Sequence, residues 1–250
     1  MNPMNLGDFS EQAESYARSR PEYPETMVER LVARVDLRPG DCVVDVGAGT
    51  GLFTRLLAAR GFRVAALEPN ARMRAQAPSR PNVDWSEGTF ERTGLDSSAW
   101  HWVVAAQSFH WADPSRALPE LRRVLKPDGA FTTLWNDRDN ARSPILQATM
   151  AALDRHIPGY DHGYRSRDWS DVLQATNDFD DVVLDEVRHD VHMTSRRYLD
   201  LWRSNNHIAT AAGENLTRFL ADVEAILAEQ HGEVIVPYVC RAWTARPVRR

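Results

Sequence analysis

The residues from Val43 to Thr54 read VVDVGAGTGLFT, and they place three glycines directly after a strand-like run. Because glycine has no Cβ, the backbone at Gly47, Gly49 and Gly51 can lie directly against a ligand. The helix expected after this turn begins with unpaired backbone N–H groups, which bind polar or anionic ligand atoms. Together with Ala48, these glycines predict a cradle for a nucleotide-like molecule.

Two acidic residues narrow the class of ligand. The glycine fingerprint of dinucleotide-binding proteins requires a glycine at position 52, where this chain has Leu52. Asp45, just ahead of the turn, would repel phosphates, but it could accept a hydrogen bond from an ammonium group or orient the loop. Glu68 follows at about the separation at which an acid reaches ribose hydroxyls. The pattern therefore disfavours a pyrophosphate and favours a cationic or zwitterionic nucleoside.

The elements that must position these residues alternate between helix-period and strand-like segments from residue 24 to residue 134. This alternation indicates an α/β domain with a parallel sheet, whose ligands lie at the carboxyl ends of the strands. Near the end of the chain, Pro237 suggests that the last strand is at an edge or bulged. The strand-like segments before residue 137 are DCVVDVG (41–47), FRVAALE (62–68), NVDWSEG (82–88), HWVVAAQ (101–107) and AFTTLW (130–135).

Four motifs in this order, VVDVGAGTGLFT, ALEPN, AAQSFHWAD and LKPDGAF, resemble the class I S-adenosylmethionine-dependent methyltransferases. The segments YARSRPEYP and FHW are similar to the branch that contains trans-aconitate-type small-molecule methyltransferases. The resemblance spans residues 9–134. It implies a Rossmann-like α/β fold with a seven-stranded, mostly parallel sheet in the order 3-2-1-4-5-7-6, an antiparallel last strand, and helices on both faces.

By position, the resemblance also implies how the cofactor is held. The glycine turn wraps the methionine part of S-adenosylmethionine, and Glu68, followed by Pro69, holds the ribose. Met73 packs near the adenine, with Thr89 and Phe90 at its edge, although Met73 and Phe90 suit a hydrophobic core equally well. Gln107 faces the methionine end or the transferred methyl group.

Candidate acceptor residues come from four places in the sequence. Tyr16, Arg20 and Tyr23 lie in YARSRPEYP. This segment either folds over the cofactor, with Arg20 or a tyrosine near the carboxylate of the cofactor or of the substrate, or forms surface contacts; we expect Arg20 to bind the cofactor and the two tyrosines to bind the substrate. His110 and Trp111 follow the fourth strand, where His110 is a candidate base or else a structural imidazole. Further residues that could line the acceptor pocket are Trp135 and Asn136 after the fifth strand, and Trp202, Asn206 and His207 after the sixth, with His207 a second candidate base.

The chemistry needs little acid–base catalysis, because a sulfonium is already a strong electrophile and the protein must mainly align the acceptor and exclude water. An ionised carboxylate acceptor requires no base, whereas a phenol, an enol carbon or an amine does. The product of the cofactor is S-adenosylhomocysteine. Two alternatives stay open: a protein that binds S-adenosylmethionine but catalyses a non-methylating reaction, and a nicotinamide-dependent oxidoreductase.

Composition limits the partners and the setting. The net charge of −5, the scattered basic residues and AAQSF in place of an Asn-Pro-Pro-aromatic motif favour a small-molecule substrate over nucleic acid. Two cysteines, a polar start and no long apolar run predict a cytoplasmic protein without a membrane span, and we expect a monomer or homodimer without a metal. We expect one domain over residues 1–250, divided into a helical cover (1–36), a cofactor-binding core (37–136), a helical insertion over the acceptor pocket (137–180) and the C-terminal part of the sheet (181–250).

Overall fold

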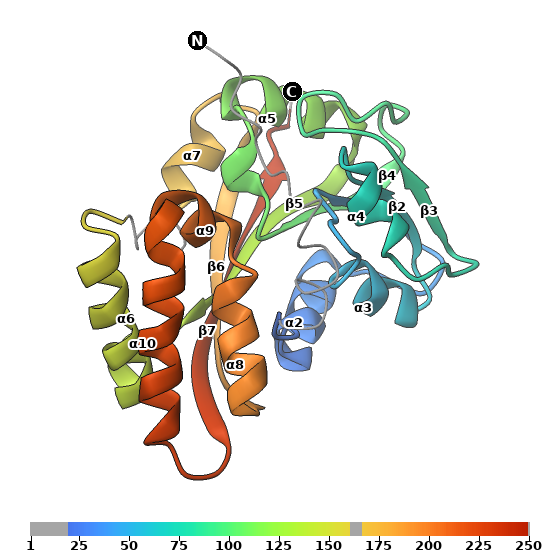
Figure 1. Cartoon of the computed structure of the whole chain (residues 1–250). Helices are drawn as coiled ribbons and strands as arrows, with labels where there is room; N and C mark the ends of the chain where they lie inside the picture. Colours follow the sequence, from blue (N-terminus) through green and yellow to red (C-terminus); the bar gives the residue numbers. More distant parts are fainter. Residues whose placement is uncertain (1–19, 161–166, 250) are drawn as a thin grey trace.

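The computed structural model describes residues 20–160 and 167–249, and within α9 it leaves the side chains of Asn206 and His207 undescribed. Its centre is a seven-stranded sheet in the order β3-β2-β1-β4-β5-β7-β6 (Figure 1). Strands β1 to β5 pair in parallel, and β7 is antiparallel to both of its neighbours, so the expected sheet is confirmed. The strands are β1 (Cys42–Val46), β2 (Arg63–Leu67), β3 (Val83–Ser86), β4 (Trp100–Ala106), β5 (Leu125–Arg138), β6 (Phe179–Met193) and β7 (Val234–Pro247).

The helices bury one side each. In α2 the apolar residues Met27, Leu31 and Val35 recur at helical spacing and are buried. Helix α5 begins with Pro114, which follows the N-cap residue Asp113; the carboxylate of Asp113 accepts the N–H of Ser115. The α-helices are α2 (Glu25–Val35), α3 (Thr54–Ala59), α4 (Ala71–Ala75), α5 (Pro114–Val124), α6 (Pro144–His156), α7 (Ser170–Gln174), α8 (Ser195–Arg203), α9 (Asn206–Ala212) and α10 (Leu216–Ala228); the 3₁₀ turns are η1 (Phe109–Trp111), η2 (Asn140–Arg142) and η3 (Gly213–Asn215).

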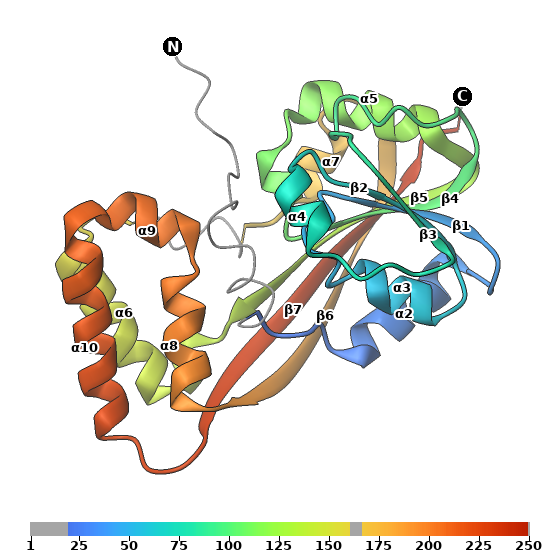
Figure 2. The same ribbon diagram turned by 45° about the vertical axis from the view of Figure 1, so that its right-hand side comes forward.

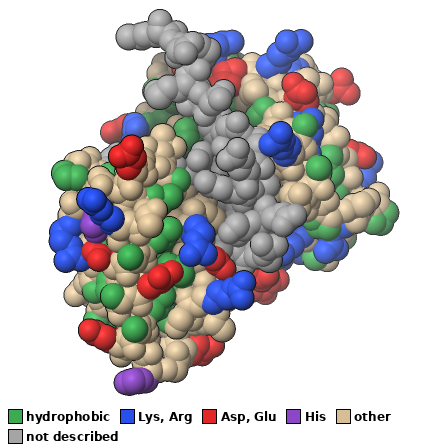
Figure 3. All heavy atoms as spheres, in the orientation of Figure 1, with side chains coloured by type: hydrophobic (Ala, Val, Ile, Leu, Met, Phe, Trp, Pro, Cys, Tyr) green, Lys and Arg blue, Asp and Glu red, His purple; other side chains and the backbone are tan. Residues whose placement is uncertain are grey.

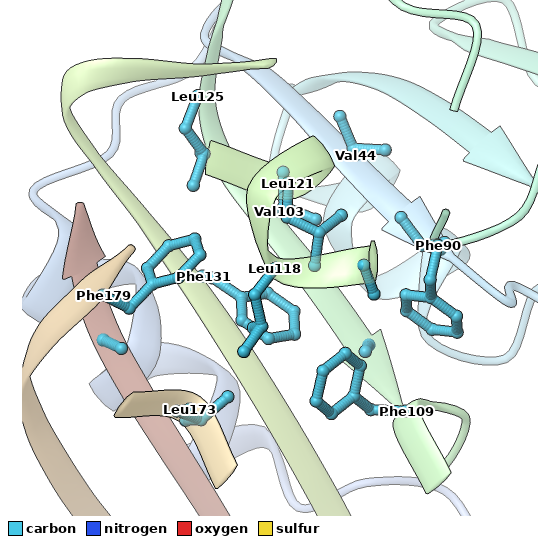
Figure 4. Close-up of a cluster of buried hydrophobic side chains, with 14 of the residues drawn as sticks. Val44, Phe90, Val103, Phe109, Leu118, Leu121, Leu125, Phe131, Leu173 and Phe179 are labelled. Atoms are coloured by element: carbon cyan, nitrogen blue, oxygen red, sulfur yellow. The ribbon is translucent and has the colours of Figure 1, made fainter. Parts of the chain in front are cut away.

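Hydrophobic clusters cover both faces of the sheet, because successive strand residues point to opposite sides. On one face, α5 and α7 pack over the strands; Figure 4 shows Leu118 and Leu121 of α5 lying against the sheet near Val103 and Phe131. On the other face, residues of α2 and α3 pack with Val43 and other strand residues. The sheet is therefore a rigid, doubly covered platform whose carboxyl edge carries the loops.

A helical lobe extends this platform beyond the carboxyl end of β5. The pairing of β5 with β7 ends at Arg138 opposite Tyr238, whereas β6 and β7 remain paired up to Met193 opposite Val234. Helices α6, α8, α9 and α10 form a third hydrophobic cluster with this two-stranded extension (Figure 2). Because β5 runs parallel to β1 and β4, the helical lobe lies on the side of the sheet where those strands end.

The last strand corrects one expectation. Pro237 suggested an edge or bulged strand, but β7 lies between β5 and β6, and its register opposite Asp190 is regular. The carbonyl oxygen of Pro237 accepts the N–H of Asp139, just past the last paired residues of β5. In an antiparallel strand, the N–H and C=O of one residue point to the same neighbouring strand. An N–H at residue 237 would therefore point toward β5, and the pairing of β5 with β7 ends one residue away, at Tyr238, so no paired residue of β5 loses a donor.

Helix α2 and the segment before it each form hydrogen bonds with the sheet. Arg34 donates from Nε and Nη2 to both carboxylate oxygens of Asp185 on β6, at 2.6 and 2.9 Å. Near the start of the helix, the amide of Asn136 donates to the carbonyl oxygen of Glu22 at 3.3 Å. The bond to Glu22 places the segment before α2 next to the carboxyl end of β5.

Candidate functional site

The glycine turn lies at the carboxyl end of β1 and is closed by both neighbouring strands. Gly47 has a φ of +68°, and its N–H donates to the carbonyl oxygen of Leu67 at 2.8 Å. A Cβ at this position would lie 2.6 Å from the Cβ of Ser108, whose hydroxyl donates to the carbonyl oxygen of Val46 at 2.8 Å. Glycine is therefore required at position 47 by the backbone conformation and by the close approach of the chain after β4.

Two backbone donors hold the carboxylate of Glu68. The N–H of Gly49 donates to Oε2 and the N–H of Asn70 donates to Oε1, each at 2.9 Å. Glu68 is 9% exposed, and burial raises the pKa of its carboxyl group, while the two N–H donors and the charge of Arg74 oppose that rise. Each carboxylate oxygen has a further lone pair, so Glu68 can still accept hydrogen bonds from a pair of hydroxyl groups.

Asp45 is fully buried on β1, directly ahead of the turn. Burial raises the pKa of its carboxyl group to about 7; the hydroxyl of Thr54, which donates to Oδ2 at 2.6 Å, opposes the rise, and the charge of Glu68 adds to it. The other oxygen, Oδ1, has no hydrogen-bond donor among the residues that the structure describes. A cationic donor near this oxygen would satisfy it and favour the ionised carboxylate.

The chain after β4 has an unusual backbone at the same edge. Gln107 has a φ of +57°, in the left-handed region that non-glycine residues rarely adopt, and its N–H donates to the carbonyl oxygen of Leu134 at 2.8 Å. The following 3₁₀ turn buries Phe109 completely, which anchors His110 and Trp111 at the surface end of the strand. The rings of His110 and Trp111 lie 4.7 Å apart and both side chains are half-buried.

These groups fit a nucleoside that carries an amino-acid tail. Glu68 offers paired acceptors for a ribose diol, Asp45 has an orphaned buried oxygen suited to an ammonium group, and the backbone at Gly47 leaves no space for a side chain. A model of the methyltransferase domain family matches residues 44–133, which contain all of these groups. An uncharacterised methyltransferase of Mycobacterium tuberculosis (strain ATCC 25618 / H37Rv) is 32% identical over 224 residues, which cover 88% of this chain and 85% of the relative. This chain belongs to the class I S-adenosylmethionine-dependent methyltransferases.

Solved structures of methyltransferases share the fold of this methyltransferase. A putative type II methyltransferase from Anaeromyxobacter dehalogenans has a TM-score of 0.67 and 21% identity, with 92% of this chain and 99% of that chain covered. The phosphoethanolamine N-methyltransferase 2 of Haemonchus contortus, in complex with phosphomonomethylethanolamine and S-adenosylhomocysteine, has a TM-score of 0.57 and 12% identity, with 98% and 61% covered. These structures show the fold, while the relative and the family model show the family, whose cofactor is S-adenosylmethionine and not a nicotinamide dinucleotide.

The residues predicted at the adenine end of the cofactor lie around the turn with different exposures. Met73 of α4 is 4% exposed, and its terminal methyl carbon lies 3.5 Å from the position of a Cβ at Gly49. Phe90 is also buried and packs edge-to-face on Phe109 at 5.4 Å, whereas Thr89 is exposed. Pro69 is exposed beside Glu68. Their contacts with the adenine remain predictions.

The predicted acceptor residues divide between separate hydrophobic clusters. Trp135 is fully buried and stacks on Trp169 at 4.3 Å, on the α5 and α7 face of the sheet. Trp202 is fully buried in the helical lobe. Tyr23 is buried on the α2 and α3 face, edge-to-face with Phe53 at 5.1 Å. The structure thus does not bring these three rings together; each of them packs in a different hydrophobic cluster.

Polar candidates lie closer to the carboxyl edge. Arg20 is buried, and its carbonyl oxygen accepts a hydrogen bond of 3.4 Å from Nη2 of Arg197. Asn136 is buried, and besides its bond to Glu22 it accepts a hydrogen bond of 2.8 Å from Nε2 of His189. Tyr16 lies outside the described residues, as do the side chains of Asn206 and His207, so these predictions are untested.

Two polar residues that the sequence did not suggest as acceptor contacts, His189 and Arg138, lie next to these candidates. His189 is half-buried on β6, stacks on the ring of Tyr238, and has its pKa lowered by burial. Arg138, the last residue of β5, places its guanidinium 4.1 Å from the centre of the Trp202 ring. The signal that could have found Arg138 is strand alternation, since Asn136 and Arg138 are two residues apart on β5 and point to the same face of the sheet.

Surface charge, possible metal sites and possible membrane spans can also be assessed for the described part of the chain. Acidic and basic side chains are interspersed on the face shown in Figure 3. Within residues 20–160 and 167–249, no three His, Cys, Asp or Glu side chains are grouped so that they could hold a metal ion. None of the helices formed by these residues is long and apolar enough to cross a membrane.

Proposed function

We propose that this methyltransferase transfers the methyl group of S-adenosylmethionine to an oxygen, carbon or nitrogen atom of a small-molecule acceptor. The observation that supports the cofactor half of this proposal most strongly is the carboxylate of Glu68, which is buried and fixed by the N–H of Gly49 at 2.9 Å. The acceptor binds at the carboxyl edge of the sheet, on the side where the helical lobe lies. This placement follows the general rule for ligands of parallel sheets.

In this proposal the chain holds the cofactor through groups on three neighbouring strands. The backbone of residues 47–51 lies against the methionine part, Asp45 accepts from its ammonium group, and Glu68 accepts from the ribose hydroxyls. Gln107 faces the methyl group from the end of β4. Bound S-adenosylmethionine supplies an electrophilic methyl group on a sulfonium, which aromatic rings attract by roughly 0.5 to 2 kcal/mol when they lie close.

The task of the protein is then to align the acceptor lone pair with the methyl–sulfur bond and to exclude water. An acceptor that is already anionic, such as a carboxylate, loses no proton. A phenol, enol carbon or amine loses one, and His110, at the carboxyl end of β4, is the first side chain we propose for that proton. His207 is the second.

A small acceptor is favoured over a nucleic acid by the net charge of −5 and by the mixed surface charges. The similarity of YARSRPEYP and FHW to the trans-aconitate-type branch supports a small metabolite, and a role in secondary metabolism is consistent with it. A cytoplasmic protein, monomeric or dimeric, is the setting in which we propose that this reaction takes place.

The experiment that tests this proposal is incubation of the protein with S-adenosylmethionine carrying an isotopically labelled methyl group and a panel of carboxylic acids, phenols, amines and heterocycles. We expect S-adenosylhomocysteine and one labelled product to form in equal amounts. The Glu68→Gln variant is the negative control, since it retains the acceptor side. Cofactor binding without labelled product from any acceptor class, together with conversion of an acceptor that leaves the cofactor intact, would contradict methyl transfer.

A further inference from the structure

We propose that Arg138 binds an oxyanion of the acceptor, a carboxylate or phosphate group that lies several ångströms from the methylated atom. The inference rests on the proposed function and makes Arg138 a specificity-determining residue of the acceptor site. It starts from the position of Arg138 at the carboxyl end of β5, where the sheet meets the helical lobe.

The guanidinium of Arg138 is half-buried and has one side covered. It lies 4.1 Å from the centre of the ring of Trp202, which is fully buried. Burial raises the pKa of the Tyr198 hydroxyl, and the nearby positive charge of Arg138 opposes that rise. An aromatic ring against the face of a guanidinium leaves the N–H donors at its edge available, and those donors match the two oxygens of a carboxylate or phosphate.

No acidic side chain neutralises Arg138 within the described part of the chain. The neighbouring carboxylate, that of Asp137, accepts the backbone N–H of Arg138 at 3.1 Å. Arg142, four residues further on, pairs with Asp190 at 3.7 Å. A half-buried cation without a counter-ion is costly unless solvent or a ligand compensates it, and here the position faces the proposed acceptor side.

A second arginine, on the helix that carries Trp202 and Tyr198, also has no acidic partner among the described residues. Arg197 lies in the first turn of α8, one residue before Tyr198, and its Nε is buried without a hydrogen-bond partner among the described residues. Its Nη2 donates to the carbonyl oxygen of Arg20, and no acid pairs with it in the described part of the chain. Among the described residues, the start of α8 and the end of β5 therefore each carry a positive charge without a counter-ion, which favours an anionic ligand on this side of the molecule.

The oxyanion bound by Arg138 lies far along β5 from the proposed site of methyl transfer. Arg138 lies four residues beyond Leu134, whose carbonyl oxygen accepts the N–H of Gln107. At about 3.3 Å per residue, the Cα of Arg138 is roughly 13 Å further along the strand. If the methyl group is transferred near Gln107, Arg138 contacts a remote part of the acceptor. Its oxyanion thus fixes the orientation of the acceptor and does not take the methyl group.

The test uses the full chain labelled with 5-fluorotryptophan and saturated with S-adenosylhomocysteine. The chain has eight tryptophans, and the ¹⁹F resonance of Trp202 is assigned by its loss in Trp202→Phe. The protein is titrated with glutarate and, separately, with inorganic phosphate, with sodium chloride at equal ionic strength as the reference. We expect a saturable shift of the Trp202 resonance with the carboxylate or the phosphate and none with chloride.

Three variants decide whether the shift belongs to Arg138. Arg138→Gln should weaken the saturable shift at least about tenfold, and Arg138→Lys should weaken it less, because it keeps the charge and loses the planar fork. Arg142→Gln makes the same change of charge at a paired arginine and should titrate like the unmodified protein. Unchanged ¹⁹F resonances of the other tryptophans show that each variant is folded.

The inference is wrong if the unmodified protein shows no saturable shift, if chloride gives the same shift, or if Arg138→Gln titrates like the unmodified protein. Glutarate alone supports a carboxylate-bearing acceptor and phosphate alone a phosphorylated one. The titration involves no methyl transfer, so its failure in a protein that methylates an acceptor contradicts the role of Arg138 and leaves the proposed function standing. Saturable binding in a protein that transfers no methyl group contradicts the proposed function instead.

Discussion

The backbone N–H of Gly49 donates a hydrogen bond of 2.9 Å to Oε2 of Glu68, nineteen residues further along the chain. This bond joins the glycine turn after β1 to the acid that ends the second strand segment. The same turn is bound to β2 by the N–H groups of Gly47 and Ala48, which both donate to the carbonyl oxygen of Leu67. The two halves of the proposed cofactor site therefore form one unit, and a change in one half should affect the other.

Replacing Gly47 by alanine should lower the stability and weaken the binding of S-adenosylhomocysteine. The φ of +68° costs an alanine about 1 to 2 kcal/mol. In addition, its Cβ would lie 2.6 Å from the Cβ of Ser108, and such overpacking costs about 1 to 3 kcal/mol. Chemical denaturation should show a loss of about 2 to 5 kcal/mol in the free energy of unfolding.

Gly94→Ala is the matched control for the contact between a Cβ at residue 47 and Ser108. Gly94 has a similar φ of +71°, and a Cβ there meets nothing within 4 Å. This variant should lose about 1 to 2 kcal/mol from the backbone conformation alone and should bind S-adenosylhomocysteine like the unmodified protein. Equal losses of stability in the two variants would show that the approach of Ser108 has no effect.

The unfolding free energy should depend on pH through Asp45. Its pKa is about 7 in the folded protein and 3.8 ordinarily, so the folded state binds more protons between these values, and the free energy of unfolding falls as pH rises. Relative to Asp45→Asn, the decrease should be up to about 1.4 kcal/mol per pH unit and about 4 kcal/mol in total. The measurement is denaturant unfolding of both proteins without cofactor from pH 4 to pH 8. A relative stability that rises with pH over this interval would show that the carboxyl group is stabilised in its ionised form.

Asn136→Asp should raise the pKa of His189. In the unmodified protein, burial lowers the pKa of His189 below its ordinary value of 6.5. Asn136 accepts the Nε2–H of His189 at 2.8 Å, and a carboxylate at the same place favours the protonated ring. An NMR titration of the His189 ring should therefore move its midpoint to higher pH in the variant. An unchanged or lower midpoint would mean that residue 136 and His189 do not interact in solution.

That the groups of the proposed cofactor site lie together could be predicted from sequence, because these groups are close along the chain. The strand-like run, the glycines and the acid at Glu68 lie within a short stretch, and the observed hydrogen bonds join them. The order of the last strands followed from the resemblance to a known family and could not be derived from periodicity alone. Alternation along β6 and β7 does not define how an antiparallel pair is aligned.

The acceptor side could not be predicted in the same way, because it depends on which face each side chain points to. The sequence indicates both Trp135 and Asn136 as acceptor contacts, yet neighbouring strand residues point to opposite faces. Trp135 packs against the cluster that includes α5 and α7, while Asn136 faces the start of α2. Likewise, the sequence indicates a single helical insertion over residues 137–180, whereas in the structure α6 lies in the helical lobe and α7 packs on the main sheet. The positions of these side chains and helices depend on how segments far apart in the sequence pack together, which local sequence patterns do not specify.

Calorimetric titration of the folded protein with S-adenosylhomocysteine, compared between the unmodified chain and Glu68→Gln, tests the central claim most directly. The control is Glu87→Gln, because the side chain of Glu87 is 78% exposed. We expect saturable binding in the unmodified protein and in the control, and binding about 10- to 100-fold weaker in Glu68→Gln, since hydrogen bonds to a charged group are worth about 1.5 to 3 kcal/mol. Equal affinity of Glu68→Gln and the unmodified protein, or no heat of binding in a folded unmodified sample, would contradict the account.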